Sequence, residues 1–357
     1  MRRLTARQAY AALGALLAAA LVLSACAGAF AFTPAELVRL LVNWADGAHG
    51  PPLADADALR RDVLVTLRLP RVLLAGLTGA VLGVSGTLMQ GLFRNPIVEP
   101  GLTGTSAGAA LGAAAVIVLG TGSATPFGAA GVTLGAAASP LLAAAGAFAA
   151  TWVVYRLSSS FGRVDVFTLL LAGVAVNAVC AALTGLLAYA ARDPQARSIT
   201  FWNLGTFTTA SWPGVLLVAA VAAVGLPLAV RDAKALNALM LGEDEAALLG
   251  LDPARLTVRL LVVNTCLVAA ATSVVGVIAF VGLVVPHLLR LLRSADYAFL
   301  LPGATLLGAA LMEVVDVVAR VVVAPAELPV GIITAVVGAP LFLALLARQR
   351  RRGTPDV

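Results

Sequence analysis

Residues 68–113 read RLPRVLLAGLTGAVLGVSGTLMQGLFRNPIVEPGLTGTSAGAALGA. Two long apolar runs, 69–92 and 98–120, are separated by a short break that contains Asn95-Pro96. A second proline-bearing turn, Glu99-Pro100, lies at the start of the second run. Each run is long enough for the roughly 20 residues that an α-helix needs to cross a bilayer. Because the apolar residues are continuous and do not alternate, the pattern predicts membrane-spanning helices and not a β-barrel.

Small residues recur at helical spacing in both runs. They are Gly76, Gly79, Gly83 and Gly86 in the first run, and Gly101, Gly104, Gly108 and Gly112 in the second. Such series let helix backbones approach closely, so they indicate tight packing more than a pore. Proline-bearing turns, here and at Pro286-His287 and Leu328-Pro329, are tolerated at membrane depth where the backbone lines a cavity or is covered by protein.

The whole chain has the composition of these runs. Its 357 residues are 61% hydrophobic and 12% charged, and the mean hydropathy is +0.98, whereas soluble domains are about 45–50% apolar. The sequence therefore predicts a single all-α integral membrane domain over residues 1–357 with about ten spans. We place them near 9–31, 69–92, 98–120, 131–157, 166–190, 212–231, 256–277, 279–292, 299–323 and 329–347. The eighth is short for a full crossing, which favours either burial among its neighbours or a longer true extent.

The N-terminal residues Met1–Cys26 also resemble a lipoprotein signal peptide, with two early arginines and a Leu-Ser-Ala-Cys ending. We expect a retained first span, because cleavage would leave no soluble body to tether. Cys26, Cys180 and Cys266 each lie inside an apolar run, far apart in sequence, which indicates buried thiols and neither a disulfide nor a metal site.

The basic residues set the orientation. If the N-terminus is cytoplasmic, 16 of the 24 basic residues fall in inner segments, as the positive-inside rule requires of a protein with both termini inside. The eight outer ones are Arg39, Arg60, Arg61, Arg68, Arg71, Arg192, Arg197 and Arg320. This topology places residues 32–66 outside, as a loop, and residues 234–259 in the cytoplasm. The charge reflects membrane orientation and gives no basic stripe for nucleic acid.

Residues 234–259, KALNALMLGEDEAALLGLDPARLTVR, are the one long polar interruption. We expect two short helices, the first ended by Gly242 and the second by a left-handed Gly250, before Asp252 and Pro253 begin a long helix. From the local pattern alone, this segment is either a docking feature or a plain loop.

Three outer arginines also have two interpretations. Arg68 and Arg71 lie three residues apart at the head of the second span, and Arg320 ends the ninth. They form either a basic patch that receives an acidic partner, or unrelated contacts in which Arg68 reaches lipid headgroups and Arg320 pairs with Asp316 one turn back.

Several kinds of chemistry lack the residues they need. A nucleotide-binding loop requires Gly-Lys-Ser/Thr, and the only lysine, Lys234, lies between alanines. With His49 and His287 as the only histidines, Ser/His/Asp catalysis is equally unsupported. We expect no catalytic residues, no metal site and no bound cofactor.

Glu313 and Asp316 are intramembrane carboxyls that an ion-coupled transporter would use. Asn177, Asn264 and Gln90 either bridge helices or face a wet pathway.

Residues 68–113 resemble the signature of the FecCD family, the permeases of type II ABC importers for iron siderophores, haem and vitamin B12. So do the segments LNALMLGEDEAALLGLD, GVIAFVGLVVPHLLRLL and APAELPVGIITAVVGAPLFLALL. The resemblance covers nearly the whole chain after residue 60.

The resemblance implies a homodimeric, ten-helix permease in a bacterial cytoplasmic membrane, with two ATPase subunits that use ATP inside and a periplasmic substrate-binding protein outside. It implies that Leu239 to Gly250 are coupling helices seated in an ATPase cleft. The coupling residues are then Leu239, Gly242, Glu243, Ala246, Leu249 and Gly250. Arg68, Arg71 and Arg320 match positions where a vitamin B12 permease of the family receives glutamates from its binding protein.

The resemblance also points to a pathway. The segment GRVDVFT, residues 162–168, resembles the cytoplasmic gate, with Val166 and Phe167 in place of small hydroxyl residues and Asp165 beside them. Residues 169–207 look most like haem-importing members, and Arg192 or Arg197 near the outer mouth would meet haem propionates. The alternative is that both arginines belong to the docking surface or lie among lipid headgroups. The pathway or gate residues expected are Asp165, Val166, Phe167, Gln90, Asn177, Arg192 and Arg197. Haem is the first choice of cargo, ahead of a ferric siderophore or cobalamin.

Overall fold

The computed structural model describes residues 5–28, 30–46, 55–120, 138–160 and 163–353. In chain order the helices are α1 (Ala6–Cys26), α2 (Pro34–Asp46), α3 (Asp55–Val63), the π-helix η2 (Leu64–Arg68), α4 (Leu69–Leu92), the 3₁₀ helix η3 (Pro100–Thr103), α5 (Thr105–Leu119), α7 (Ala138–Ser158), α8 (Val166–Ala190), α9 (Asp193–Asn203), α10 (Trp212–Arg231), α11 (Ala233–Leu239), α12 (Glu243–Leu248), α13 (Pro253–Val275), α14 (Val281–Leu292), α15 (Tyr297–Val321) and α16 (Val330–Gly353). In these ranges the strands are one antiparallel pair, β1 (Ser159–Ser160) with β2 (Arg163–Val164).

Ten of these helices correspond to the ten predicted spans. Seven are long and apolar enough to cross a membrane, and α5, α14 and α16 are shorter apolar helices. The predicted all-α membrane fold is confirmed. The first residues of the predicted fourth span, 131–137, lie outside the described residues. Helix α14 has only 12 residues and packs against α4, α15 and α16. Of the two alternatives for the short eighth span, burial among its neighbours is therefore the one observed.

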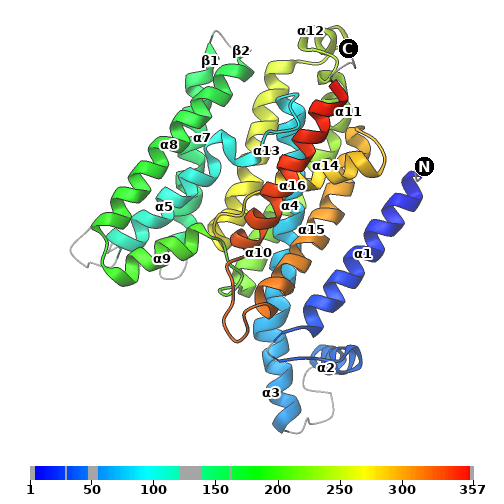
Figure 1. The fold of residues 1–357 in the computed structure, drawn as a ribbon, viewed down its shortest axis with the longest axis vertical. Coiled ribbons are helices and arrows are strands. Elements are labelled where there is room, and N and C mark those ends of the chain that lie inside the picture. Colours follow the sequence, from blue (N-terminus) through cyan, green and yellow to red (C-terminus); the bar gives the residue numbers. More distant parts are fainter. Residues whose placement is uncertain (1–4, 29, 47–54, 121–137, 161–162, 354–357) are drawn as a thin grey trace.

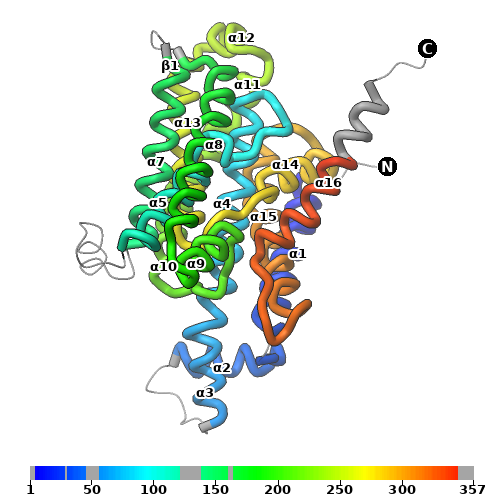
Figure 2. Tube along the Cα trace, turned by 60° about the vertical axis from the view of Figure 1, so that its left-hand side comes forward, coloured from blue at the N-terminus to red at the C-terminus, as the bar shows by residue number. Residues whose placement is uncertain are grey.

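Figure 1 shows that α1 begins and α16 ends toward the end of the bundle that carries α11 and α12. We call this the inner end, following the predicted topology. The opposite, outer end carries α2 and α3. Residues 32–66, expected as a loop, therefore contain two helices. Helix α3 continues through η2 into α4, so the three form one rod that extends beyond the other spans (Figure 2).

The central helix is α4, in which 20 of 24 residues are buried. It packs against α15, α14, α13 and α10. A Cβ atom at Gly79 would collide with the backbone of Gly308 in α15, and one at Gly308 would collide with Gly79. The same holds for Gly86 against Gly282 in α14. The prediction that these glycines serve close packing is confirmed.

The proline breaks do different things. Helix α5 begins at Thr105 and not near 98, because Pro96 and Pro100 leave residues 93–104 as turns and a short 3₁₀ helix. Pro286, predicted to break a helix, lies inside α14. Pro286 lies in the second turn of α14, where it removes one backbone hydrogen bond of the helix. The neighbouring helices hold the backbone in place there.

Candidate functional site

The inner segment consists of α11, α12 and the turn that leads to α13. Its predicted local structure is confirmed in detail. Gly242 has φ +143° and precedes α12, Gly250 has φ +83°, and the Asp252 side chain accepts the N–H of Arg255 at 3.1 Å to cap α13. The acidic residues in the first turn of α12 complement the helix dipole.

Two sets of polar contacts hold this segment to the spans. Asp232, at the start of α11, accepts two hydrogen bonds from the Arg259 guanidinium in α13, at 2.6 and 2.8 Å. On the other side, Asn237 donates to Asp296 at 2.7 Å and accepts the N–H of Tyr297 at 3.0 Å, at the start of α15. The Asn237 amide thereby holds the pKa of Asp296 below its usual range. The segment is fixed to two long helices.

Burial divides the predicted coupling residues. Leu239 and Ala246 are buried inside the chain, whereas Leu249 is 65% exposed. Glu243 forms an exposed ion pair with Arg94 at 3.4 Å. Leu239 and Ala246 therefore pack within the chain and shape the segment, and the coupling role of the six residues stays a prediction. The sequence analysis missed two exposed leucines, Leu241 before α12 at 69% exposure and Leu248 at the end of α12 at 88%. A leucine beside or at the end of a short charged helix is a usable signal for such exposure.

The outer arginines form one cluster with residues from α1, α15 and the turn before α16. Arg71 binds Asp316 and Glu327, each at 2.8 Å, and Arg320 binds Asp316 at 3.0 Å. Arg320 also donates to the Ala27 carbonyl at 2.7 Å, and Arg68 donates to the carbonyls of Ala27 and Phe30. A hollow of about 280 Å³ beside the cluster is lined by all three arginines and Glu327.

The three arginines of the predicted basic patch thus lie together, but they are largely enclosed by the chain. Arg68 is 8% exposed and Arg320 is 7% exposed, because the chain's own carbonyls and Asp316 take up their donors. The predicted pairing of Arg320 with Asp316 is confirmed, while Arg68 turns toward the outer end of α1 and not toward lipid. Glu327 and the carbonyls after α1 were missed, since they come from distant parts of the chain. The docking role itself stays a prediction.

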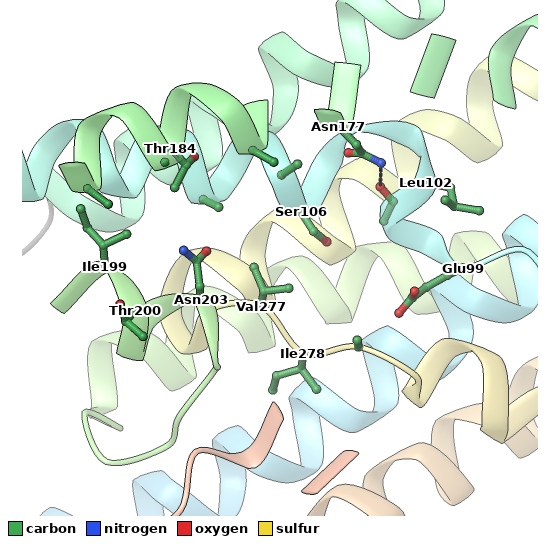
Figure 3. Close-up of a pocket in the computed structure, with 17 residues that line it drawn as sticks. Glu99, Leu102, Ser106, Asn177, Thr184, Ile199, Thr200, Asn203, Val277 and Ile278 are labelled. Atoms are coloured by element: carbon green, nitrogen blue, oxygen red, sulfur yellow. Dashed lines mark hydrogen bonds between the residues drawn. The ribbon is translucent and has the colours of Figure 1, made fainter. Parts of the chain in front are cut away.

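A cavity of about 540 Å³ lies between α5, α8, α9 and the link from α13 to α14. Figure 3 shows Asn177 and Thr184 on one wall, Ile199 and Asn203 on another, and Glu99 at the far end. Alanine, glycine and aliphatic side chains make up most of the remaining lining. The backbone of Gly101 and Leu102, in the proline break, lines it too, as expected for a break at membrane depth.

The polar atoms of this cavity are few. Asn177 donates to the Gly101 carbonyl at 3.3 Å, and Glu99 accepts the N–H of Phe280 at 2.9 Å. Within the described chain the Asn177 Oδ1 and Thr184 Oγ1 atoms are buried without a hydrogen-bond partner. Such a cavity suits a mostly apolar organic ligand that offers a small number of hydrogen bonds.

The other predicted pathway residues lie elsewhere. Gln90 accepts from Arg290 at 2.6 Å and donates to Gly282 at 3.2 Å, so it bridges α4 to α14. Arg192 and Arg197 are exposed on the first turns of α9 and do not line the cavity.

The expected gate lies at the start of α8. Asp165 caps this helix, its carboxylate accepting from Thr168, and the hydrogen bonds hold its pKa below the usual range. Phe167 follows at 69% exposure, and Val166 packs against the main core. Gly162 is outside the described residues. The gate role stays a prediction.

Known proteins resemble this chain over most of its length. It is 43% identical to the hemin transport system permease protein of Yersinia pestis over 298 residues, which cover 81% of this chain and 84% of that protein. It is 37% identical to the vitamin B12 import system permease protein of Klebsiella pneumoniae over 326 residues, or 91% and 94% of the two chains. A solved ABC transporter structure, described as inward-facing and of the metal-chelate type, superposes with a TM-score of 0.78 at 29% identity, covering 96% of this chain and 99% of that one.

A family profile, the FecCD transport family, matches residues 16–348. That match, the two permeases and the shared architecture agree with one another and with the ten-span fold. This chain belongs to the FecCD transport family, as a multi-pass permease subunit of an ABC importer.

Proposed function

We propose that this permease carries haem from a periplasmic binding protein across a bacterial cytoplasmic membrane. The observation that carries the proposal is the 43% identity to a hemin transport permease, against 37% for a vitamin B12 permease. The cavity beside Asn177 supports it, because its aliphatic lining matches a planar, largely apolar cargo. Cobalamin is the second candidate, since the vitamin B12 relative matches a larger share of the chain, and a ferric siderophore is the third.

ATP hydrolysis belongs to a separate subunit in this proposal, because the single lysine, Lys234, lies in no phosphate-binding loop. Two ATPase subunits would serve a homodimer of this chain. The inner segment is the surface for them: Leu241, Leu248 and Leu249 are exposed apolar side chains on a segment braced to α13 and α15. Exposed leucines gathered on a small, rigidly held segment are typical of a protein–protein interaction site.

The outer cluster is the proposed docking site for the binding protein. With Arg68, Arg71 and Arg320 against Asp316 and Glu327, these five side chains carry a net charge of +1. An acidic side chain entering the hollow would compete with Glu327 for Arg71. Arg71→Glu should therefore weaken docking most at low salt, because the attraction between the cluster and an approaching acidic partner acts through solvent and is screened by salt. Equal affinity of the variant and the unaltered permease at all salt concentrations would remove the cluster from the docking site.

Reconstitution in proteoliposomes tests the function. The permease, its ATPase and its binding protein are assembled, and uptake of haem, cobalamin and a ferric siderophore is compared with and without ATP. We expect ATP-dependent haem uptake; its absence while cobalamin enters would overturn haem and keep the importer. Uptake driven by an ion gradient alone would instead favour Glu313 and Asp316 as coupling sites.

A cavity-filling variant locates the route. Gly185 lines the cavity, and a Cβ atom there would have no atom within 4 Å. Gly185→Phe should block uptake while the protein stays folded. The matched control is Gly14→Phe on α1, where a Cβ atom also meets nothing within 4 Å. Equal uptake by both variants would move the route away from this cavity.

A further inference from the structure

Helix α2 lies across the outer end of the bundle, roughly perpendicular to α1 and α4 (Figures 1 and 2). One of its faces is held by apolar packing. Leu37 and Leu40 are buried against Phe32 and against Leu64 of η2. Cys26, the last residue of α1, packs against the same cluster. Helix α2 therefore sits at the depth where the first span ends.

Two charged side chains of α2, Glu36 and Arg39, pair with α3. Glu36 pairs with Arg60 at 2.6 Å, and Arg39 pairs with Asp57 at 2.9 Å. Glu36 also accepts the N–H of Thr33 at 2.8 Å and so caps its own helix. These contacts occupy the polar side of α2 with partners from the same chain.

The remaining face of α2 is apolar and uncovered. Val38 is 63% exposed and Val42, one turn later, is 55% exposed. Trp44, one turn after Leu40 on the packed side, is still 47% exposed. A helix bathed in water would place polar residues on its outer face. Here the outer face is as apolar as the packed one, so the side chains require a covering that is not water.

Lipid is the covering that the neighbourhood supplies. Helix α1 is a membrane span on the edge of the bundle, and its Val22 and Leu23, near its outer end, are 50% and 48% exposed. Those side chains face the acyl chains. Since α2 shares a packing cluster with the end of α1, its free apolar face continues the lipid-facing surface of α1 at the level of the headgroups. Tryptophan is enriched at this level of membrane proteins.

We propose that α2 is an interfacial anchor, whose Val38 and Val42 face lies in the outer headgroup layer of the bilayer. The energetic reason is the burial of apolar surface at the boundary of headgroups and acyl chains. Because ion pairs join α2 to α3, and α3 continues into α4, this anchor fixes the outer end of the central helix. The proposal holds whichever cargo the permease carries.

Spin labels test the position of α2 in the assembled transporter. Cys26, Cys180 and Cys266 are first replaced by alanine, and ATP-dependent uptake confirms that this background folds. Single cysteines at Val38 and Val42 are labelled with a nitroxide, and collision with lipid-soluble oxygen is compared with collision with a water-soluble nickel complex. Leu59→Cys is the control, because this leucine is 60% exposed on α3, a helix that extends farther outward than α2 (Figure 2).

We expect the oxygen-to-nickel ratio at Val38 and Val42 to exceed that at Leu59 severalfold. Equal ratios at the three positions would show a water-facing helix, and exclusion of both reagents would show a protein covering; either result overturns the proposal. A second measurement uses the protein with its native cysteines in place. Brominated lipid should quench the part of the tryptophan fluorescence that Trp44→Phe removes, and a component insensitive to bromine would contradict the anchor.

Discussion

Removing the Arg259 guanidinium is the sharpest test of how the inner segment is held. Arg259→Ala deletes both hydrogen bonds to Asp232, which is only 4% exposed. Hydrogen bonds to charged groups contribute about 1.5–3 kcal/mol each. Because the Arg259 side chain is 51% exposed, water screens the pair, and we expect a loss of about 1–2 kcal/mol in total.

That loss should appear as local opening of α11. A change of about 1–2 kcal/mol raises the open fraction roughly 5–30-fold. Amide hydrogen exchange on the permease in lipid nanodiscs measures this fraction for residues 233–239. Uptake per ATP hydrolysed, in the reconstituted importer, should fall in the same variant, because a loosened segment cannot pass the ATPase movement to α13.

Arg255→Ala is the matched control. Arg255 lies one turn before Arg259 in α13 and pairs with Asp252 at 3.0 Å, but its side chain is 87% exposed. Its removal should change exchange in α11 less than about twofold, since exposed pairs contribute little. If both variants exchange alike, the Asp232–Arg259 pair does not hold the segment. If exchange in α11 changes but uptake per ATP hydrolysed does not, the Asp232–Arg259 pair stabilises the segment without serving transport.

Other variants test the remaining contacts. Gly79→Ala should lower the thermal midpoint in detergent by the equivalent of about 1–3 kcal/mol, as overpacking does. Gly14→Ala should not lower it, because a Cβ atom at Gly14 meets nothing within 4 Å and alanine favours a helix more than glycine does; equal midpoints would contradict the close α4–α15 contact. Glu243→Arg should lower uptake per ATP without loss of fold, through repulsion of Arg94; full transport would end the coupling assignment. Asn237→Ala should destabilise the protein at pH 7, because the Asn237 amide lowers the pKa of Asp296 in the folded state. A carboxyl whose pKa is lowered on folding contributes stability above its ordinary pKa, about 4 for an aspartate, and the contribution is lost as the folded carboxyl is protonated. The destabilisation should therefore shrink progressively below about pH 4. A difference between the proteins that stays constant through this pH range would contradict that reasoning.

Local chemistry explains what the sequence predicted well. Long apolar runs are hard to place anywhere but in a membrane, so ten helices emerged near their predicted positions. The turns at Gly242, Gly250 and Asp252 follow from residues whose conformational preferences act over three or four positions. Such features need no knowledge of the rest of the chain.

Contacts between distant segments explain what was missed. The sequence analysis interpreted Arg68 and Arg320 as surface charges because it could not place their backbone partners. The carbonyls after α1 are 38 and 41 residues from Arg68 and 293 residues from Arg320. The separation of the buried Leu239 from the exposed Leu248 likewise depends on how α11 and α12 pack on the spans. A short helix offers too few turns for periodicity to reveal which side faces inward.

Helices α4 and α15 connect the two ends of this permease. At the outer end Arg71 of α4 binds Asp316 of α15, and at the inner end Asn237 binds both Asp296 and Tyr297 at the start of α15. Between these ends the contact of Gly79 with Gly308 leaves no room for the helices to slide without lifting apart. Packed interiors transmit displacement in this way, because they are dense and not continuously deformable. The α4–α15 pair is therefore the element we expect to move as one body between the outer arginine cluster and the inner segment. Gly79→Ala bears on this directly: a variant that folds with a lower midpoint yet keeps full uptake per ATP would show that the tight contact stabilises the permease without carrying its motion.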